Sequence, residues 1–371
     1  MAPKVLLLYI SEHSGHHCAS LAIERALKAA EPRVETMNIN SFNYTNPILE
    51  KVINRAYMGV VKRTPEIWDY LYDNPKVVKR TQKLRDIIHR FNTGRLKALL
   101  DESKPDAIVC TQAFPCGMIA DYKKTFNLSA PLIGVLTDYA PHSYWIYNNV
   151  DRYIVPSKET GQKLIDDGIE ISRVLDFGIP IDTKFASRHD RAALCSKLGI
   201  DSSKKCLLVM GGTQGLGPIK SLVRLLDLSH LDLETIVVTG TNKKLCRWLS
   251  GRRFRKKFII LPYAENIEEL MQAASVIITK PGGITTAEAL AAGLPMLIVH
   301  PLPGQEAMNT KFLLKEGVAV KAASPQDVPV LLEELLYNEN KLKSMGEKGR
   351  SLSKPDSAKN IARLILELIR R

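Results

Sequence analysis

Short apolar runs alternate with longer amphipathic stretches along most of the chain. Each run is a continuous series of Val, Ile and Leu, which is typical of parallel strands buried on both faces of a sheet. The runs are KVLLLYI, DAIVC, PLIGVL, DRYIVPS and VLDFGIP in the first half, and KCLLVMGG, TIVVTG, KFIILPY, SVIITK, PMLIVHP and VAVKA in the second. The stretches between them have helical spacing. The two series predict an α/β protein with two doubly wound domains.

The boundary between the two series is expected at residues 177–190, FGIPIDTKFASRHD, where an extended proline-containing segment precedes a new helical start. We therefore expect an N-terminal domain over residues 1–180 and a C-terminal domain over residues 190–355. The last residues, about 356–371, have the pattern of an amphipathic helix with a basic end. We expect this helix to pack back on the N-terminal domain.

Length and composition agree with this division. A chain of 371 residues is too long for one typical core and suits two domains. No stretch of about 18 apolar residues could span a bilayer, and the N-terminal apolar run is interpreted as a first strand. The six cysteines form no C-x-x-C pair and several lie in apolar runs, which predicts reduced, buried thiols and a cytosolic protein.

The net charge of +13 predicts acidic partners, which could be nucleic acid, an anionic membrane or acidic metabolites. Residues 42–97 hold twelve Lys and Arg against five Asp and Glu, with aromatic residues among them. This mixture fits a membrane-binding element, or equally a solvated face with aromatic side chains packed inward. Residues 242–258 hold eight basic residues and no acidic one, which also fits a charged helix face. No recognised nucleic-acid module is present.

Polar or glycine-rich loops follow the predicted strands, at the edge of the sheet where ligands bind in open α/β folds. GGTQGLG (211–217) fits a phosphate loop or a tight strand-to-helix turn. In KPGGITTAEALAAG (280–293), Thr285 or Thr286 is expected to cap a helix whose N-terminus could hold a diphosphate. Glu288 could bind ribose hydroxyls or complement the helix dipole. In PLPGQEAMN (301–309), Gln305 and Glu306 could bind a sugar or lie on a polar surface.

Three histidines, His13, His16 and His17, follow the first predicted strand in SEHSGHH. They are too crowded for a zinc site, and no distant Cys or His cluster completes a ligand set. One of them could be a general base, because an imidazole titrates near neutral pH. Alternatively they face solvent or bond to the backbone. In TDYAPHSYW, Asp138 could orient a histidine, bind acceptor hydroxyls or cap the next segment.

The motifs SGHHCAS, TDY…W…NVDRYIVPS, GIPI, KPGGITTAEA and PLPGQE, in this order, resemble those of the processive diacylglycerol glycosyltransferases and monogalactosyldiacylglycerol synthases. These are family 28 glycosyltransferases; the peptidoglycan enzyme that adds N-acetylglucosamine to a lipid-linked precursor is a more distant relative. The resemblance implies the GT-B fold, with two Rossmann-like domains facing a cleft. It implies inverting transfer of glucose or galactose from a UDP-sugar to diacylglycerol or a glycosyl-diacylglycerol, with no cofactor and no essential metal. The implied location is cytoplasmic, peripheral on the inner face of the cell membrane.

The implied partners are a UDP-sugar, a diacylglycerol-type lipid and an anionic membrane surface, and no nucleic acid. The resemblance assigns catalysis to His16, as the base, and to Asp138. The residues that match donor-binding positions are Ser14, Gly15, Gly212, Thr213, Tyr263, Ala264, Gly282, Gly283, Thr285, Glu288, Gln305 and Glu306. Those expected at the membrane or the acceptor are Tyr57, Met58, Trp68, Tyr70 and Trp145.

The sequence departs from the family pattern at two places. Asp182 follows GIPI where relatives often carry Arg, so no phosphate contact is expected from this position. The first loop contains HSGH where many relatives have GGGH or GNGH, so a different backbone path is expected there. Three alternatives remain open: lipid-linked peptidoglycan N-acetylglucosaminyl transfer, a UDP-sugar epimerase on the same fold, and a non-catalytic basic protein bound to membrane or nucleic acid.

Overall fold

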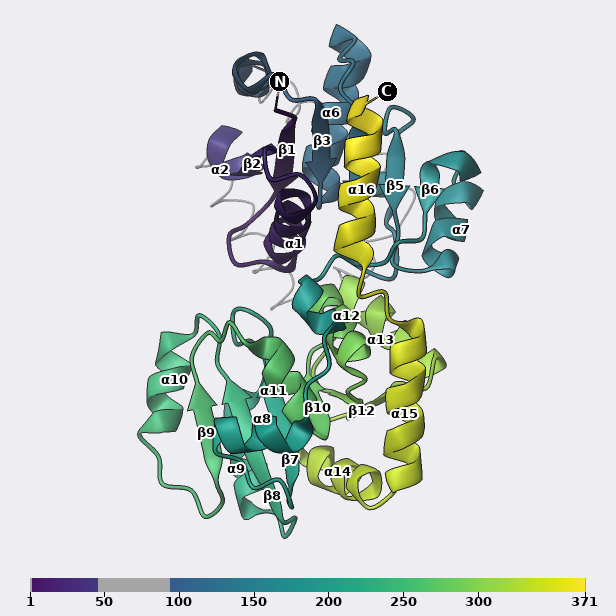
Figure 1. The fold of residues 1–371 in the computed structure, drawn as a ribbon. Helices are drawn as coiled ribbons and strands as arrows, with labels where there is room; N and C mark the ends of the chain where they lie inside the picture. Colours follow the sequence, from purple (N-terminus) through teal and green to yellow (C-terminus); the bar gives the residue numbers. More distant parts are fainter. Residues whose placement is uncertain (1, 46–93, 371) are drawn as a thin grey trace. The chain divides into compact units, whose positions relative to one another are not determined.

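The computed structural model describes residues 2–45 and 94–370. The chain divides into two compact units (Figure 1). Unit 1 comprises Met1–Thr183, Pro303–Gln305 and Asp356–Arg371, and unit 2 comprises Lys184–Leu302 and Glu306–Pro355. Both units have a parallel sheet with helices alternating along the chain, so the predicted fold class is confirmed.

In unit 1 the described strands form one parallel sheet in the order β2-β1-β3-β4-β5-β6. The strands are β1 (Lys4–Tyr9), β2 (Glu35–Asn40), β3 (Ala107–Cys110), β4 (Leu132–Val135), β5 (Arg152–Ile154) and β6 (Val174–Leu175). The helices with both ends described are α1 (Gly15–Ala30), α2 (Ser41–Thr45), α6 (Ala113–Phe126), α7 (Lys158–Asp166) and α16 (Ser357–Arg370), with short 3-10 turns η1 (Ser143–Trp145) and η2 (Ile171–Arg173). Residues 94–103 are also helical. Every apolar run expected in this half contains a strand.

The strand β2, by contrast, was not predicted. Its sequence ETMNIN is largely polar, and its residues alternate in exposure over most of their length. Among the described strands, it lies at one end of the sheet and pairs with β1, with Lys4 opposite Glu35. A strand at the end of a sheet needs no continuous apolar run, because it is less completely covered than the central strands.

Unit 2 contains a second parallel sheet in the order β12-β11-β10-β7-β8-β9. Its strands are β7 (Lys205–Met210), β8 (Leu233–Val238), β9 (Phe258–Leu261), β10 (Val276–Thr279), β11 (Met296–Ile298) and β12 (Ala319–Lys321). Its helices are α8 (Arg191–Leu198), α9 (Ile219–Leu228), α10 (Lys243–Ser250), α11 (Ile267–Ala273), α12 (Gly283–Ala292), α13 (Gln305–Lys315), α14 (Val328–Leu336) and α15 (Glu339–Leu352), with η3 (Thr183–Ala186) and η4 (Pro325–Asp327).

The central strands of both sheets are buried on their two faces. In β1, the consecutive residues Leu6, Leu7 and Leu8 are each 1% exposed or less, although neighbours on a strand point to opposite sides. Leu6 and Leu8 belong to one apolar cluster of unit 1, and Leu7 belongs to another. The two clusters lie on opposite faces of this sheet, so apolar side chains cover it on both sides.

The C-terminal helix α16 packs on α1 of unit 1, as expected from its amphipathic pattern (Figure 1). Ala358, Ile361, Ala362 and Ile365 recur at helical spacing and are all fully buried. At the start of the helix, the Ser357 hydroxyl donates to the Gly178 carbonyl at 2.7 Å. The end of the chain therefore completes the apolar layer on this face of the first sheet.

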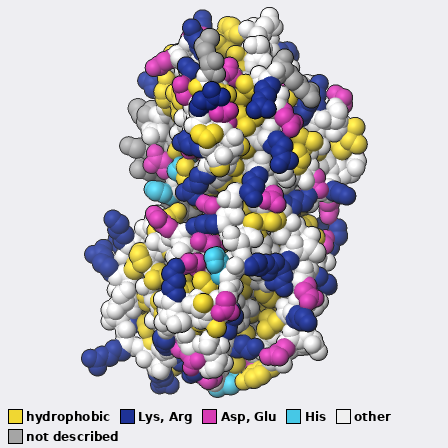
Figure 2. Space-filling view, in the orientation of Figure 1, with side chains coloured by type: hydrophobic (Ala, Val, Ile, Leu, Met, Phe, Trp, Pro, Cys, Tyr) yellow, Lys and Arg dark blue, Asp and Glu magenta, His cyan; other side chains and the backbone are white. Residues whose placement is uncertain are grey.

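The basic stretch at residues 242–258 contains α10 and carries many exposed charges. Leu245 and Leu249 are buried, whereas Lys243, Lys244 and Arg247 are exposed, and Figure 2 shows Lys and Arg side chains at the outer edge of unit 2. Trp248 is half-buried, with the Lys220 ammonium and the Arg252 guanidinium each 4.6 Å from its ring centroid. This is the charged helix face considered above, anchored by leucines and by cation–π contacts.

All six cysteines are free thiols, and four of them are buried. Within the described residues, no helix combines the length and the apolar character needed to cross a membrane.

We expect Ile361→Ala to destabilise unit 1, because it leaves a cavity at the interface between α16 and α1. The free energy of unfolding should fall by about 2–5 kcal/mol. The measurement is urea unfolding followed by near-ultraviolet circular dichroism. Arg363→Ala, on the exposed side of the same helix, is the control and should change stability by less than about 0.5 kcal/mol. Equal losses in the two variants would show that the helix is not held by its apolar face.

Candidate functional site

The loop between β1 and α1 carries Ser14, Gly15 and His16. Ser14 is the N-cap of α1: its hydroxyl accepts from the His17 backbone N–H at 3.3 Å and donates to the Ile10 carbonyl at 2.9 Å. The helix itself begins at Gly15. Ser14, predicted to bind the donor, therefore uses its side chain to fix the turn that presents His16.

His16 is held by two threonines from neighbouring strand ends. Its Nδ1 lies 2.8 Å from the carbonyl oxygen of Thr111 and 3.0 Å from the hydroxyl of Thr137. Thr111 also donates its hydroxyl to the His16 carbonyl at 2.9 Å. Because a carbonyl oxygen can only accept, Nδ1 carries the proton in the bond to Thr111, and the lone pair of the neutral ring lies on Nε2.

Burial lowers the pKa of His16 below its ordinary value of 6.5. The negative charge of Asp138 and the Thr111 carbonyl act in the opposite direction but do not overcome burial. At neutral pH the imidazole is thus uncharged and able to accept a proton at Nε2. The two predicted catalytic residues, His16 and Asp138, are brought close enough to interact. Thr111 and Thr137 were missed, although each follows a predicted strand directly.

His142 belongs to the same group. Burial, and secondarily the charge of His16, lower the pKa of His142 to about 4. Its ring contacts the rings of Tyr144 and Trp145, with centroids 5.6 Å and 6.3 Å away. Trp145 was expected at the membrane or the acceptor, but it is only 5% exposed and belongs to the core of unit 1. Its indole packs in this core rather than forming a surface contact.

The other two histidines of the first loop have structural contacts. The ring of His17 stacks on Tyr9 at 4.2 Å, and its Nδ1 accepts from the His13 backbone N–H at 3.3 Å. His13 is exposed and adopts a left-handed conformation, with φ of 57°. Within the described residues, no group of His, Cys, Asp and Glu is arranged to hold a metal ion. Tyr57, Met58, Trp68 and Tyr70 lie outside the described residues.

Unit 2 brings its own predicted loops together at the carboxyl ends of β7, β10 and β11. Gly212 has a φ of 68°, and a Cβ there would lie 3.3 Å from Cε of Lys280. Thr213 is fixed by its carbonyl, which accepts from the Thr241 N–H at 2.8 Å. A Cβ on Gly240 would lie 2.1 Å from that same carbonyl. Glycine is therefore required where this loop approaches both the KPGG loop and the end of β8.

Lys280 links the KPGG and PGQE loops. Its ammonium forms an ion pair with Glu306, whose second carboxylate oxygen accepts from the Leu302 N–H at 2.8 Å. The Asn309 amide donates to the Pro281 carbonyl at 2.9 Å. The side chains of Lys280 and Glu306 are only 17% and 11% exposed. Glu306 therefore holds two loops together, and its predicted contact with the donor sugar stays a prediction. Lys280 was missed although it ends a predicted strand.

The helix α12 begins at Gly283 with Gly282 as its N-cap, and no side chain accepts from its first N–H groups. The expectation that Thr285 or Thr286 caps this helix is wrong, because both threonines lie within its first turn and are buried. Among the residues that the structure describes, the Thr286 hydroxyl has no hydrogen-bond partner. The uncapped end, with Gly212 and Lys280 beside Gly282, is a concentration of positive potential suited to an anion.

The remaining predicted donor residues lie on the same elements or on the loop after β9. Glu288 is half-buried within α12, and Gln305 is the first residue of α13. Tyr263 follows β9, is 51% exposed and precedes the half-buried Ala264. The donor contacts of these residues stay predictions.

The departure at Asp182 has a local explanation. The Asp182 carboxylate forms an ion pair with Arg25 of α1, within unit 1. The acidic residue after GIPI therefore ties the end of the first domain to its first helix.

The whole chain can be superposed on solved structures with two Rossmann-like domains. The MurG protein of Acinetobacter baumannii gives a TM-score of 0.60 at 16% identity, over 98% of this chain and 100% of that one. UDP-GlcNAc 2-epimerase from Neisseria meningitidis gives 0.60 at 14% identity, with the same coverage. These similarities show the fold, which is the GT-B architecture.

Sequence similarity defines the family. Residues 16–181 match the monogalactosyldiacylglycerol (MGDG) synthase family, and residues 206–361 match the glycosyltransferase family 28 C-terminal domain. Processive diacylglycerol beta-glucosyltransferases of Bacillus thuringiensis (strain Al Hakam) and Bacillus cereus (strain ATCC 10987 / NRS 248) are 31% and 30% identical to this chain. These alignments cover 98% of this chain and 94% and 93% of those proteins. The chain belongs to the family 28 glycosyltransferases, and the resemblance seen in its motifs is confirmed.

We expect Lys280→Met to destabilise unit 2 by about 3 kcal/mol, because it leaves the Glu306 carboxylate buried without its cation. The double variant Lys280→Met/Glu306→Gln should recover most of this loss, since no uncompensated charge remains. Urea unfolding of the wild type, both single variants and the double variant measures the coupling. Additive losses would show that the two side chains do not form a pair in solution.

The pH dependence of stability should report on His142. The folded chain holds this imidazole neutral with a pKa of about 4, against an ordinary value of 6.5. Between these values the unfolded chain binds more protons, so the free energy of unfolding falls as the pH is lowered. The fall should be smaller in His142→Asn than in the wild type. Identical pH profiles for the two proteins would contradict the burial of His142.

Proposed function

We propose that this protein transfers a hexose from a UDP-sugar to diacylglycerol, or to a glycosyl-diacylglycerol, with inversion at the sugar C1. The observation that carries the proposal is the fixed orientation of His16, which leaves the Nε2 lone pair available in a neutral imidazole. The curated relatives are named beta-glucosyltransferases, which favours glucose over galactose as the sugar transferred.

In the proposed reaction, the acceptor hydroxyl gives its proton to Nε2 of His16 as its oxygen attacks C1. The bond from C1 to the diphosphate breaks, and UDP leaves. Thr111 keeps Nδ1 protonated, so that only Nε2 can take the proton. The charge of Asp138 stabilises the imidazolium that forms, in the same direction as its effect on the His16 pKa.

Unit 2 would bind the donor through its strand-end loops. Solved proteins of similar fold hold UDP or UDP-GlcNAc, although at 16% and 14% identity they show the fold alone. In this chain, the uncapped N-terminus of α12 and the Lys280 ammonium would bind the diphosphate charge, with Gly212 allowing close approach of the backbone. No metal ion is required by this scheme, since these groups supply the positive potential.

The acceptor would be taken from a membrane surface by a peripheral protein on the cytoplasmic face. The names of the curated relatives support a diacylglycerol acceptor. The net charge of +13 and the basic stretch at 242–258 would favour an anionic bilayer, with each nearby Lys or Arg contributing roughly 1 kcal/mol.

An epimerase is the second candidate, because UDP-GlcNAc 2-epimerases share the fold. The two possibilities predict different requirements, since an epimerase converts its UDP-sugar without any lipid. The near-full-length relatedness to diacylglycerol glucosyltransferases favours transfer.

His16→Ala should lower lipid glycosylation about 10²- to 10⁴-fold, because the positioned base is lost. The assay incubates the full chain with radiolabelled UDP-glucose, or UDP-galactose in parallel, and vesicles containing diacylglycerol, and counts label in the extracted lipid. UDP affinity, measured by calorimetry, should be nearly unchanged, since the donor groups lie in unit 2.

His13→Ala, in the same loop, is the matched control and should retain activity. Lipid labelling by His16→Ala at the wild-type rate would reject His16 as the base. Conversion of the UDP-sugar in the absence of lipid would reject transfer in favour of epimerisation.

A further inference from the structure

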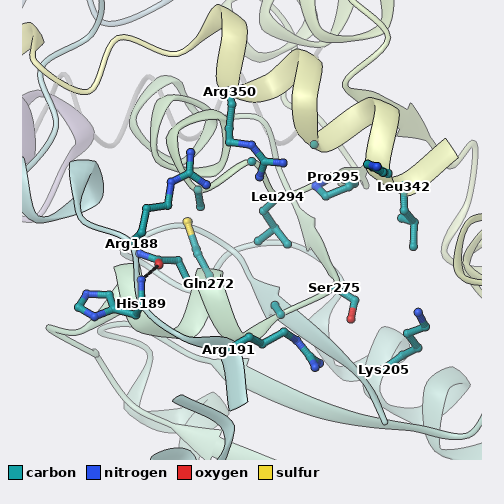
Figure 3. A pocket seen from close by; sticks show the side chains of 16 residues that line it. Arg188, His189, Arg191, Lys205, Gln272, Ser275, Leu294, Pro295, Leu342 and Arg350 are labelled. Atoms are coloured by element: carbon teal, nitrogen blue, oxygen red, sulfur yellow. Dashed lines mark hydrogen bonds between the residues drawn. The ribbon is translucent and has the colours of Figure 1, made fainter. Parts of the chain in front are cut away.

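A second concentration of basic side chains lies within unit 2, at the edge of the sheet opposite the proposed donor loops. It surrounds a hollow of about 380 Å³ (Figure 3). Lys205 begins β7, Ser275 precedes β10 and Pro295 precedes β11, so the hollow lies at the amino ends of these strands. Its volume falls within the range of about 300–1,000 Å³ that is typical of small-molecule sites.

The lining has one sign of charge. The titratable residues around the hollow are Arg188, His189, Arg191, Lys205, Lys343 and Arg350, and no Asp or Glu lines it. The lining also includes apolar and small residues, such as Leu294, Pro295 and Gly346, and the polar Gln272 and Ser275. Positive charges gathered around one hollow raise the local positive potential.

Two of these basic side chains, Arg191 and Lys205, form structural contacts. Arg191 donates to the carbonyls of Ala273, Ser202 and Lys204 at 3.0–3.2 Å, so its guanidinium stabilises the end of α11 and the turn before β7. Lys205 forms an ion pair with Glu339 at 3.2 Å. Contacts within the protein therefore explain the positions of these two cations, and no ligand is needed.

Arg188 and Arg350 differ from Arg191. Their side chains come from separate segments, the stretch before α8 and the helix α15, and point toward one another across the hollow (Figure 3). Within the described ranges, the structure records no carboxylate or carbonyl partner for either guanidinium. Two facing guanidinium groups repel each other unless an anion lies between them.

We propose that Arg188 and Arg350 form a binding site for a phosphate group, separate from the donor site. A phosphate can accept hydrogen bonds from two guanidinium groups at once, and its double negative charge relieves their repulsion. Lys343, exposed at the rim, adds a third positive charge. The phosphate could belong to a soluble metabolite or to the headgroup of an anionic lipid, and both present the same chemistry.

Arg188 and Arg350 lie in segments of unit 2 that are far apart in the chain, one before α8 and the other within α15. A phosphate bound by both arginines would link these two segments of unit 2. Occupancy of the site should therefore stabilise the folded chain.

The test is calorimetric titration of the full chain with inorganic phosphate at constant ionic strength, with UDP at saturation to occupy the donor site. Arg188→Gln and Arg350→Gln should each weaken phosphate binding about tenfold or more, since each removes a charge-assisted contact. Arg224→Gln, which removes an exposed arginine of α9 outside the hollow, is the matched control and should bind as the wild type does.

A parallel arm measures flotation of the same four proteins with phosphatidylcholine vesicles that contain phosphatidate. Loss of phosphate binding in the Arg188 and Arg350 variants, but not in the Arg224 variant, supports the site with a soluble ligand. No phosphate binding, together with vesicle binding that falls only in these two variants, supports it with a lipid headgroup. If Arg188→Gln, whose exposed side chain can be replaced without loss of folding, behaves like Arg224→Gln in both arms, the proposal is overturned.

Discussion

Each of the two parallel sheets is covered on both faces by apolar side chains, and this burial decides where chemistry can take place. A polar group inside such a sheet would have to be desolvated at a cost of several kcal/mol without a partner. The candidate sites therefore lie at the two edges where strands meet loops. At the carboxyl edges lie the His16 loop in unit 1 and the Lys280 loops in unit 2. At the amino edge of unit 2 lies the arginine-lined hollow.

The two carboxyl edges prepare their functional groups in different ways. In unit 1, backbone carbonyls and threonine hydroxyls from adjacent strand ends fix the tautomer and the orientation of His16, and burial keeps the ring neutral. In unit 2, a mostly buried ion pair between Lys280 and Glu306 joins the KPGG and PGQE loops. Gly212 allows the GGTQGLG loop to approach the KPGG loop closely. Both arrangements are preorganised, because the side chains involved are restrained by groups that do not move with them.

The positive charge of the protein is distributed among several different roles. Arg25 and Arg191 hold segments of the fold, through Asp182 and through backbone carbonyls respectively. Lys220 and Arg252 cover the ring of Trp248. The basic residues that remain to attract an anionic surface or ligand include those on the outer face of α10 and some of those around the hollow. Net charge alone could not separate these uses.

The sequence by itself determined the fold class, because short continuous apolar runs that alternate with helical stretches are typical of a covered parallel sheet, and every such run contains a strand. It also identified His16 and the three loops of unit 2, through motifs that resemble a known family. It missed β2, whose edge position requires no apolar run. Tertiary structure alone decided which groups support the site. Thr111, Thr137 and Lys280 act through contacts with residues far away in the chain, and Trp145 and Glu306 proved to be mostly buried. Such contacts depend on which strand ends become neighbours in the sheet, and this order follows from packing rather than from any local pattern.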